Sequence, residues 1–172
     1  MKKLIFLLLG VLLIAVYGCG GQSTAKNSNN SELLTSRDIE MSKDYKGTIH
    51  LTKQDFLHKV MNYEEHKEEW VFRGDKPCLI DFYADWCAPC RITSPILEEL
   101  AEEYHGQIQI FKIDTEKERE LAAVFGIQSI PSFLYCPKEG VPVMTAGIAR
   151  TPEETKQMFK QQIEKILLKS RS

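Results

Sequence analysis

Several features that would define a protein class are missing from this sequence. The 172-residue chain has no basic stripe and a formal net charge of −2 at pH 7, so nothing in it indicates nucleic-acid binding. It contains no internal repeat. Its longest apolar run, Leu4 to Val16, is too short to span a bilayer comfortably. A content of 43% hydrophobic and 27% charged residues suits one globular domain with short extensions.

Metal-binding patterns are missing as well. A zinc site needs four ligands, which normally come from two Cys-x-x-Cys pairs or from one such pair and two closely spaced histidines. This chain has one Cys-x-x-Cys pair and four scattered histidines. Those histidines are His50, His58, His66 and His105. We therefore expect no metal site.

The N-terminus has the features of an export signal. Lys2 and Lys3 precede the apolar run, which ends in small residues and Cys19. This arrangement resembles the lipobox of bacterial lipoproteins, in which the signal is cleaved before a cysteine that carries a diacylglycerol, although Tyr17 is bulky where a small residue is usual. Ordinary cleavage nearby and an uncleaved anchor are the alternatives. We expect lipidation at Cys19 and a location in the cell envelope, at a membrane face.

The segment after Cys19 differs in composition from the rest. From Gly20 to about Tyr45 it is polar, rich in Ser and Asn, and without apolar periodicity, which predicts a flexible tether. The expected division is a signal peptide at 1–18, a lipidated N-terminus and tether at 19–45, and a globular domain at 46–172.

The domain alternates strand and helix patterns. Short apolar runs predict strands, and the stretches that begin with capping residues or end at glycine predict helices. The expected strands are 48–51, 78–84, 108–113, 132–136 and 141–147. The expected helices are 52–61, 89–106, 119–126 and 151–169. This order gives parallel βα units followed by a hairpin, hence a mixed sheet flanked by helices. Pro142 places the last strand at a sheet edge.

The sequence "DFYADWCAPC" places Cys87 and Cys90 where a buried strand ends and a helix begins. A disulfide across two intervening residues removes little entropy from the unfolded chain, so a structural staple is a weak interpretation. Position favours redox chemistry, because the dipole and free N–H groups of a helix N-terminus stabilise a thiolate and lower the pKa of Cys87.

The expected reaction is thiol-disulfide exchange. Cys87, as the more exposed thiol, attacks a substrate disulfide, and Cys90 resolves the mixed disulfide. Asp81, in the apolar strand before the pair, would lie beneath it, where burial raises its pKa enough to accept the proton of Cys90. The bland alternative for Asp81 is a structural ion pair with Lys112 on the neighbouring strand, and the two roles are compatible.

Four segments together resemble the thioredoxin family: "LIDFYADWCAPC", "FKID", "VFGIQSIPSF" and "TAGIARTPEE". The resemblance extends from about Gly47 to Lys169. It implies the thioredoxin fold, an α/β architecture with a central mixed sheet of about five strands flanked by about four helices. The interval from Cys90 to Pro131 is that of a plain thioredoxin, without an inserted strand and helix.

The resemblance also implies roles for residues around the pair. Trp86 would pack beside it, and Pro131 would be the cis-proline that faces the cysteines. The backbone of Ile130 would pair with bound substrate, and Gly147 would belong to the docking groove. Asp81 would be the buried acid of the family, with Lys112 as its partner.

The sequence departs from the family pattern at two positions. Ala88 replaces the usual glycine before Pro89, and this replacement would shift the reduction potential of the cysteine pair modestly. Ala88 and Pro89 are both expected to contact the substrate. Tyr83 stands where tryptophan is common, and we interpret it as core packing. The remaining pair, Cys78 and Cys136, should approach each other across antiparallel strands. We expect two free buried thiols, with a disulfide as the alternative.

The sequence therefore predicts a thiol-disulfide oxidoreductase that acts on exported proteins, used as a protein-disulfide reductase and supplied with electrons by a membrane partner. A disulfide oxidase or isomerase and a cytochrome-maturation helper are alternatives, as is a non-catalytic thioredoxin-like binding module. No cofactor is expected beyond the Cys87–Cys90 disulfide, and the domain is expected to be a monomer.

Overall fold

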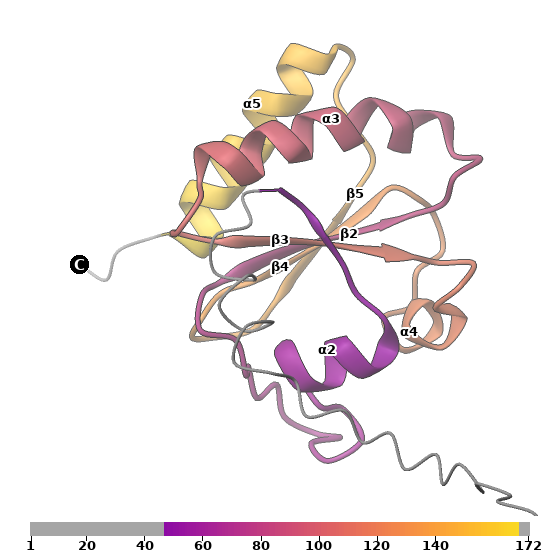
Figure 1. Cartoon of the computed structure of the whole chain (residues 1–172), viewed down its shortest axis with the longest axis vertical. Helices are drawn as coiled ribbons and strands as arrows, with labels where there is room; N and C mark the ends of the chain where they lie inside the picture. The colour runs from indigo at the N-terminus through magenta and orange to yellow at the C-terminus, as the bar shows by residue number, and fades with distance from the viewer. Residues whose placement is uncertain (1–46, 169–172) are drawn as a thin grey trace, which may run out of the picture.

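Five strands form one mixed sheet in the order β1-β3-β2-β4-β5 in the computed structural model, which describes residues 47–168 (Figure 1). The strands are β1 (Ile49–His50), β2 (Cys78–Tyr83), β3 (Gln109–Asp114), β4 (Ser132–Cys136) and β5 (Val143–Ala146). The first three run parallel, β4 is antiparallel to β2, and β5 is antiparallel to β4. The predicted order of parallel units followed by a hairpin is confirmed.

The helices cover both faces of this sheet. They are α2 (Lys53–Lys59), α3 (Ala88–Glu103), α4 (Arg119–Val124) and α5 (Pro152–Gln162), which continues as the π-helical turn η1 (Ile163–Leu167). In Figure 1, α3 and α5 lie on one side of the strands and α2 and α4 on the other. The central strand β2 is therefore covered on both faces, as its near-continuous apolar run predicts.

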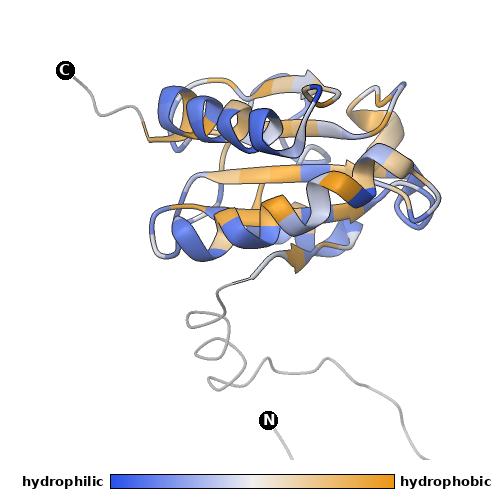
Figure 2. Ribbon diagram, turned by 90° about the horizontal axis from the view of Figure 1, so that it is seen from above, coloured by the Kyte–Doolittle hydropathy of each residue, from blue (hydrophilic) through white to orange (hydrophobic). Residues whose placement is uncertain are grey.

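Two apolar layers hold the helices in place. Alternate side chains of one strand point to opposite faces, so Leu79 packs with α3 and α5 while Ile80 packs with α2 and α4. On the first face, Phe133 meets Phe159 edge to face, with ring centroids 4.7 Å apart. Figure 2 shows the apolar strands between helices whose outer surfaces are polar. Full burial of such a side chain contributes about 1.5–3 kcal/mol.

The helix boundaries follow local chemistry. Thr52 and Asp55 form a capping box at the start of α2, and Thr151 and Glu154 form another at the start of α5. Each box satisfies N–H groups that have no partner within the helix, which is worth about 1 kcal/mol. Beyond the end of α3, Gly106 adopts a φ of 82°, a conformation that costs glycine little.

Most element boundaries differ by a few residues from the predicted ones, among them those of α2, β5 and the C-terminal helix. The helix α2 ends at Lys59, earlier than expected, and residues 62–77, for which the sequence allows a helix extension or a loop, form turns and bends. The edge strand β5 begins only after Pro142, which has no N–H to donate to a neighbour. The C-terminal helix leaves α-helical geometry at Ile163.

The predictions for the N-terminus concern residues that the structure does not describe. The signal peptide at 1–18, the lipidation site Cys19 and the tether at 19–45 all lie outside residues 47–168. The division into these segments and a domain at 46–172 therefore stays a prediction. Within the described part of the chain, no helix has the length and apolar character needed to cross a membrane.

Candidate functional site

The two cysteines of the redox pair lie at the start of α3. Cys87 is the N-cap of this 16-residue helix, and Cys90 is in its first turn. They form a disulfide, with 5.2 Å between their Cα atoms. The backbone N–H of Cys90 donates to the Sγ of Cys87 at 3.2 Å. The helix N-terminus and this N–H together stabilise negative charge on the sulfur of Cys87 once the disulfide is reduced.

The expected difference in exposure between the two cysteines is not seen. Cys87 is 2% exposed and Cys90 3% exposed, so the prediction that Cys87 is the more exposed is wrong for the disulfide form. The N-cap position, rather than exposure, distinguishes Cys87 from Cys90. The hydroxyl of Thr93 donates to the backbone carbonyl of Cys90 at 3.0 Å and holds the first turn closed.

Asp81 lies in the middle of β2 and is fully buried. Neither of its carboxylate oxygens has a hydrogen-bond donor. Burial raises the pKa of Asp81 to about 7, and the positive charge of Lys112 opposes that rise. The carboxyl group can therefore take up and release a proton near neutral pH, as the sequence predicted.

Lys112 lies directly beside Asp81 in the register of β2 and β3, but its ammonium group points elsewhere. The Nζ of Lys112 donates to the Oγ of Ser94 at 2.6 Å and lies 4.8 Å from the centre of the Tyr83 ring. Lys112 thus acts on Asp81 through its charge, without a hydrogen bond to it. The sequence predicted Asp81 as the partner of the Lys112 ammonium, but the structure places the hydroxyl of Ser94 there instead.

Ser94 and the cation–π contact of Tyr83 are the features that the sequence interpretation missed. Tyr83 was expected to pack in the core, yet it is only half-buried, and its hydroxyl lies 3.3 Å from the Nδ1 of His50. A signal for Ser94 was present in the sequence. It follows Cys90 by one helical turn, so it is a polar residue on the face that Cys90 and Leu97 turn toward the sheet.

The remaining predicted residues lie at the same end of the sheet. Ser132 is paired with Phe82, which places Pro131 beside the end of β2 that leads to Cys87. The Ile130–Pro131 peptide bond is cis, and the carbonyl of Pro131 accepts from the N–H of Gly147 at 3.0 Å. Gly147 has a φ of 83°, a conformation that a side chain would strain.

Three residues next to the disulfide are open to solvent or partly so. Trp86 is 65% exposed, Ala88 is exposed and Pro89 is half-buried. Ile130, on the other side of the pair, is half-buried. An exposed tryptophan beside a buried disulfide offers apolar surface to a partner that reaches the sulfur atoms.

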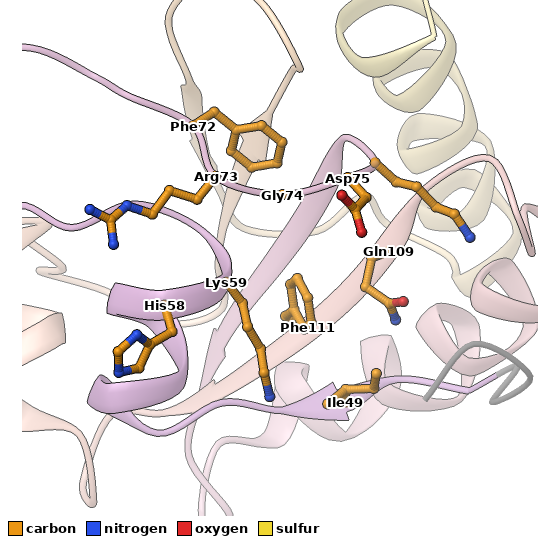
Figure 3. A pocket seen from close by; sticks show the side chains of 10 residues that line it. Ile49, His58, Lys59, Phe72, Arg73, Gly74, Asp75, Gln109 and Phe111 are labelled. Carbon is orange, nitrogen blue, oxygen red and sulfur yellow. The ribbon is translucent and has the colours of Figure 1, made fainter. Parts of the chain in front are cut away.

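A separate pocket of about 580 Å³ lies between α2, the loop before β2, and the β1 edge of the sheet (Figure 3). Its lining residues are Ile49, His58, Lys59, Phe72, Arg73, Gly74, Asp75, Lys76, Gln109 and Phe111. None of them belongs to the redox site. In residues 47–168, no group of three His, Cys, Asp or Glu side chains is placed to hold a metal ion.

A helix that begins at a cysteine disulfide, a buried acid in the strand that precedes it and a cis-proline beside the end of that strand occur together here on a five-stranded mixed sheet. A sequence model of the family described as Thioredoxin matches residues 47–165. The chain belongs to the thioredoxin family. Its membership confirms the resemblance and the fold class, and it makes the protein a thiol-disulfide oxidoreductase.

Curated thioredoxins match the region around the site. The chain is similar to thioredoxin of Borreliella burgdorferi, with 46% identity over 99 residues that cover 58% of this chain and 84% of that protein. Thioredoxin of Pyropia yezoensis is 42% identical over 85 residues, which cover 49% of this chain and 78% of the relative. A solved point mutant of thioredoxin from Halobacterium salinarum NRC-1 has the same fold, with a TM-score of 0.52 and 24% identity over 70% of this chain and 91% of that one.

Proposed function

We propose that this member of the thioredoxin family acts as a protein-disulfide reductase on exported proteins, through Cys87 and Cys90. One observation carries the proposal: Cys87 caps a long helix and accepts an N–H on its sulfur, while a buried carboxyl group that titrates near neutral pH lies in the strand before it. A nucleophile, a resolving thiol and a proton acceptor are thereby present in one site.

The reaction begins with both cysteines reduced. The thiolate of Cys87 attacks one sulfur of a substrate disulfide, forms a mixed disulfide and releases the other substrate sulfur as a thiolate, which takes up a proton. Cys90 then gives its proton to Asp81, and its thiolate attacks the Sγ of Cys87, which breaks the bond to the second substrate sulfur and releases it as a thiolate that takes up a proton. The products are the Cys87–Cys90 disulfide and a substrate with two thiols. A dithiol on a membrane partner reverses these steps to reduce the pair again.

The substrate surface is formed by the residues around the disulfide. Trp86, Ala88 and Pro89 lie on the α3 side, and Ile130 and the Pro131–Gly147 contact lie on the other. We propose that the backbone of Ile130 pairs with an extended substrate segment while Trp86 covers the side chains of that segment. Such pairing recognises the main chain of the partner, so it suits an enzyme with many protein substrates.

The direction of electron flow rests on the residues between the cysteines. The Cys-Ala-Pro-Cys sequence differs from the common thioredoxin sequence by one methyl group at Ala88, which favours a reducing protein over a strong oxidant. A disulfide oxidase or isomerase, and a cytochrome-maturation helper, use the same exchange chemistry with different partners. A non-catalytic binding module is the alternative of another class, but it would not need Cys87, Cys90, Asp81 and Pro131 together.

We propose further that the protein is held in the cell envelope by a lipid on Cys19 and draws its electrons from a membrane donor. The basis is the sequence before residue 47, with its charged start, apolar run and cysteine. In this proposal the domain is a monomer that uses no cofactor besides its own disulfide and binds neither metal nor nucleic acid.

Insulin reduction tests the proposed activity. The wild type should accelerate reduction of the insulin disulfides by dithiothreitol, and Cys87→Ser should reduce that acceleration to background. Cys78→Ala, which removes a buried thiol outside the site, is the matched control and should keep it. Equal activity in wild type and Cys87→Ser would exclude the redox function and favour the binding module.

The direction of electron flow needs a separate measurement. Equilibration of the Cys87–Cys90 pair with glutathione buffers gives its reduction potential, which we expect to resemble that of reducing thioredoxins, about −270 mV. A potential near −120 mV, as in strong oxidants, would contradict the reductase role. The Cys90→Ser variant, which cannot resolve the mixed disulfide, would then identify the substrates by trapping them.

A further inference from the structure

The environment of Lys112 shows an arrangement that the exchange reaction alone does not require. The residue is nearly buried, and its ammonium group contacts two neutral groups, the hydroxyl of Ser94 and the face of the Tyr83 ring. The adjacent Asp81, whose ionised form carries the opposite charge, receives no hydrogen bond at either oxygen. Lys112 and Asp81 are paired in the strand register, but the ammonium of Lys112 is hydrogen-bonded to Ser94 on α3 instead of to Asp81.

We propose that Ser94 is a positioning residue for proton transfer at the redox pair, because its hydroxyl holds the Lys112 ammonium on α3 and leaves the Asp81 carboxylate without a hydrogen-bonded cation. This inference rests on the oxidoreductase activity of the site but not on the direction of electron flow. In this proposal one turn of α3 carries both the resolving thiol, Cys90, and Ser94, which controls the proton acceptor Asp81.

The energetic reason lies in the needs of a buried ammonium group. An ammonium group that leaves water must keep hydrogen-bond acceptors, since an unpaired buried charge is costly. Ser94 supplies an acceptor at 2.6 Å, and the Tyr83 ring adds a cation–π contact. If the hydroxyl is removed, the ammonium must find another acceptor. A hydrogen bond from Lys112 to Asp81 would stabilise the ionised carboxylate and lower its pKa.

Other acidic residues on α3 and β3 already have partners. On α3, Glu98 accepts hydrogen bonds from the backbone N–H and the hydroxyl of Thr48. At the end of β3, Asp114 is paired with Lys117 at 2.8 Å. The further titratable groups that face this region are His50 on β1, Tyr83 on β2 and Asp85 after β2, while the Cys87–Cys90 disulfide on α3 does not titrate. Asp81 is therefore the buried acceptor to which a released ammonium would turn.

The test is a titration of Asp81 by carboxyl ¹³C NMR in the disulfide form, which needs no substrate. In Ser94→Ala, the midpoint of Asp81 should fall by at least about one pH unit relative to the wild type, the range for a nearby opposite charge. Ser94→Thr keeps the hydroxyl and should restore the wild-type midpoint. The acid limb of the pH profile for insulin reduction should move down by the same amount in Ser94→Ala. Alanine favours helix, so α3 is preserved.

A double-mutant comparison separates the ammonium from any general effect on α3. In a Lys112→Met background, Ser94→Ala should leave the Asp81 midpoint unchanged, because no ammonium remains to be released. An equal shift in both backgrounds, or an unchanged midpoint in Ser94→Ala alone, would overturn the inference. The midpoint is read without electron transfer, so a failure here is distinct from a failure of the proposed reductase activity.

Discussion

At the scale of single residues, the site includes a group that weakens the fold. The buried carboxyl of Asp81 has no donor, so its ionised form is costly, and burial raises its pKa from 3.8 to about 7 against the effect of Lys112. Asp114, one strand away, behaves in the opposite way. Burial acts to raise its pKa, but hydrogen bonds from Lys117 and from the backbone of Glu116 and Lys117 lower it below 3.8.

These opposite shifts predict opposite pH dependences of stability. The folded protein binds the Asp81 proton more tightly than the unfolded chain does, so Asp81 lowers the free energy of unfolding as pH rises from about 4 through 7, by about 2 to 3 kcal/mol between pH 5 and 8. Urea unfolding at pH 5 and 8 should show this decline in the wild type and lose it in Asp81→Asn. We also expect Asp81→Asn to slow the resolution step.

Asp114→Asn is the matched control for that experiment. Because the pKa of Asp114 is lowered by folding, its contribution to stability is present above its unfolded pKa and is lost as pH falls through its folded value. The control variant should therefore lose stability at pH 8 and keep the wild-type decline between pH 5 and 8. A decline that persists in Asp81→Asn would mean that another buried group titrates in this range.

At the scale of helices and strands, the sequence predicted the features that depend on neighbouring residues, but not those that depend on tertiary contacts. The run "SFLYC" gave the bounds of β4, and the residues Thr52 and Thr151 gave the starts of α2 and α5, because capping depends on a few neighbouring residues. The path of residues 62–77 could not be predicted, since it depends on the packing of Trp70 and Phe72 against the α2 face.

The same limit applies to the site. Cys87, Cys90, Asp81 and Pro131 follow from a pattern along the chain, whereas the partner of Lys112 depends on how α3 crosses β3. Spacing placed Lys112 beside Asp81 and the register confirms it, but the direction of a long flexible side chain is decided by whichever acceptor lies nearest. The polar position of Ser94 on a buried helix face was the sole local sign of that acceptor.

The two strands that carry the redox end also hold a second pair of cysteines. Cys78 and Cys136 are directly opposite in the β2–β4 register, and both are free and buried. The N–H of Gln109 bonds the carbonyl of Pro77, so Pro77 faces β3 and, by alternation, Cys78 exchanges its backbone bonds with β4. Side chains at such a position lie farther apart than a disulfide requires.

We therefore predict that Cys78 and Cys136 remain thiols in the oxidised protein. Burial, and then the neighbouring Cys78, raise the pKa of Cys136, which further suppresses exchange. Mass spectrometry of the non-reduced protein should show the Cys87–Cys90 cross-link without one between Cys78 and Cys136. Alkylation of both thiols should require unfolding, with Cys87 of the reduced protein as the rapidly labelled reference. A cross-linked 78–136 peptide would refute this view of the pair.

At the scale of the whole molecule, the described chain enters at one edge of the sheet, whereas the redox pair follows the central strand β2 and its substrate surface extends toward the other edge. The described chain enters next to β1, where Thr48 is bonded to Glu98, and β1 is one edge of the order β1-β3-β2-β4-β5. Gly147 follows β5 at the opposite edge and bonds Pro131 beside the disulfide. A membrane attachment before residue 47 would therefore leave the proposed substrate surface accessible.

This separation predicts that anchoring and catalysis can be removed independently. Expressed with its own N-terminus in a bacterium, the wild type should carry a lipid label and partition with membranes, because buried acyl chains contribute about 0.8 kcal/mol per methylene. Cys19→Ser should lose the label and the membrane association while it reduces insulin at the wild-type rate in detergent. Cys87→Ser is the reciprocal control, labelled and membrane-bound but inactive. An unlabelled wild type would exclude the lipid anchor, and a slower Cys19→Ser enzyme would show that the two ends of the chain are coupled.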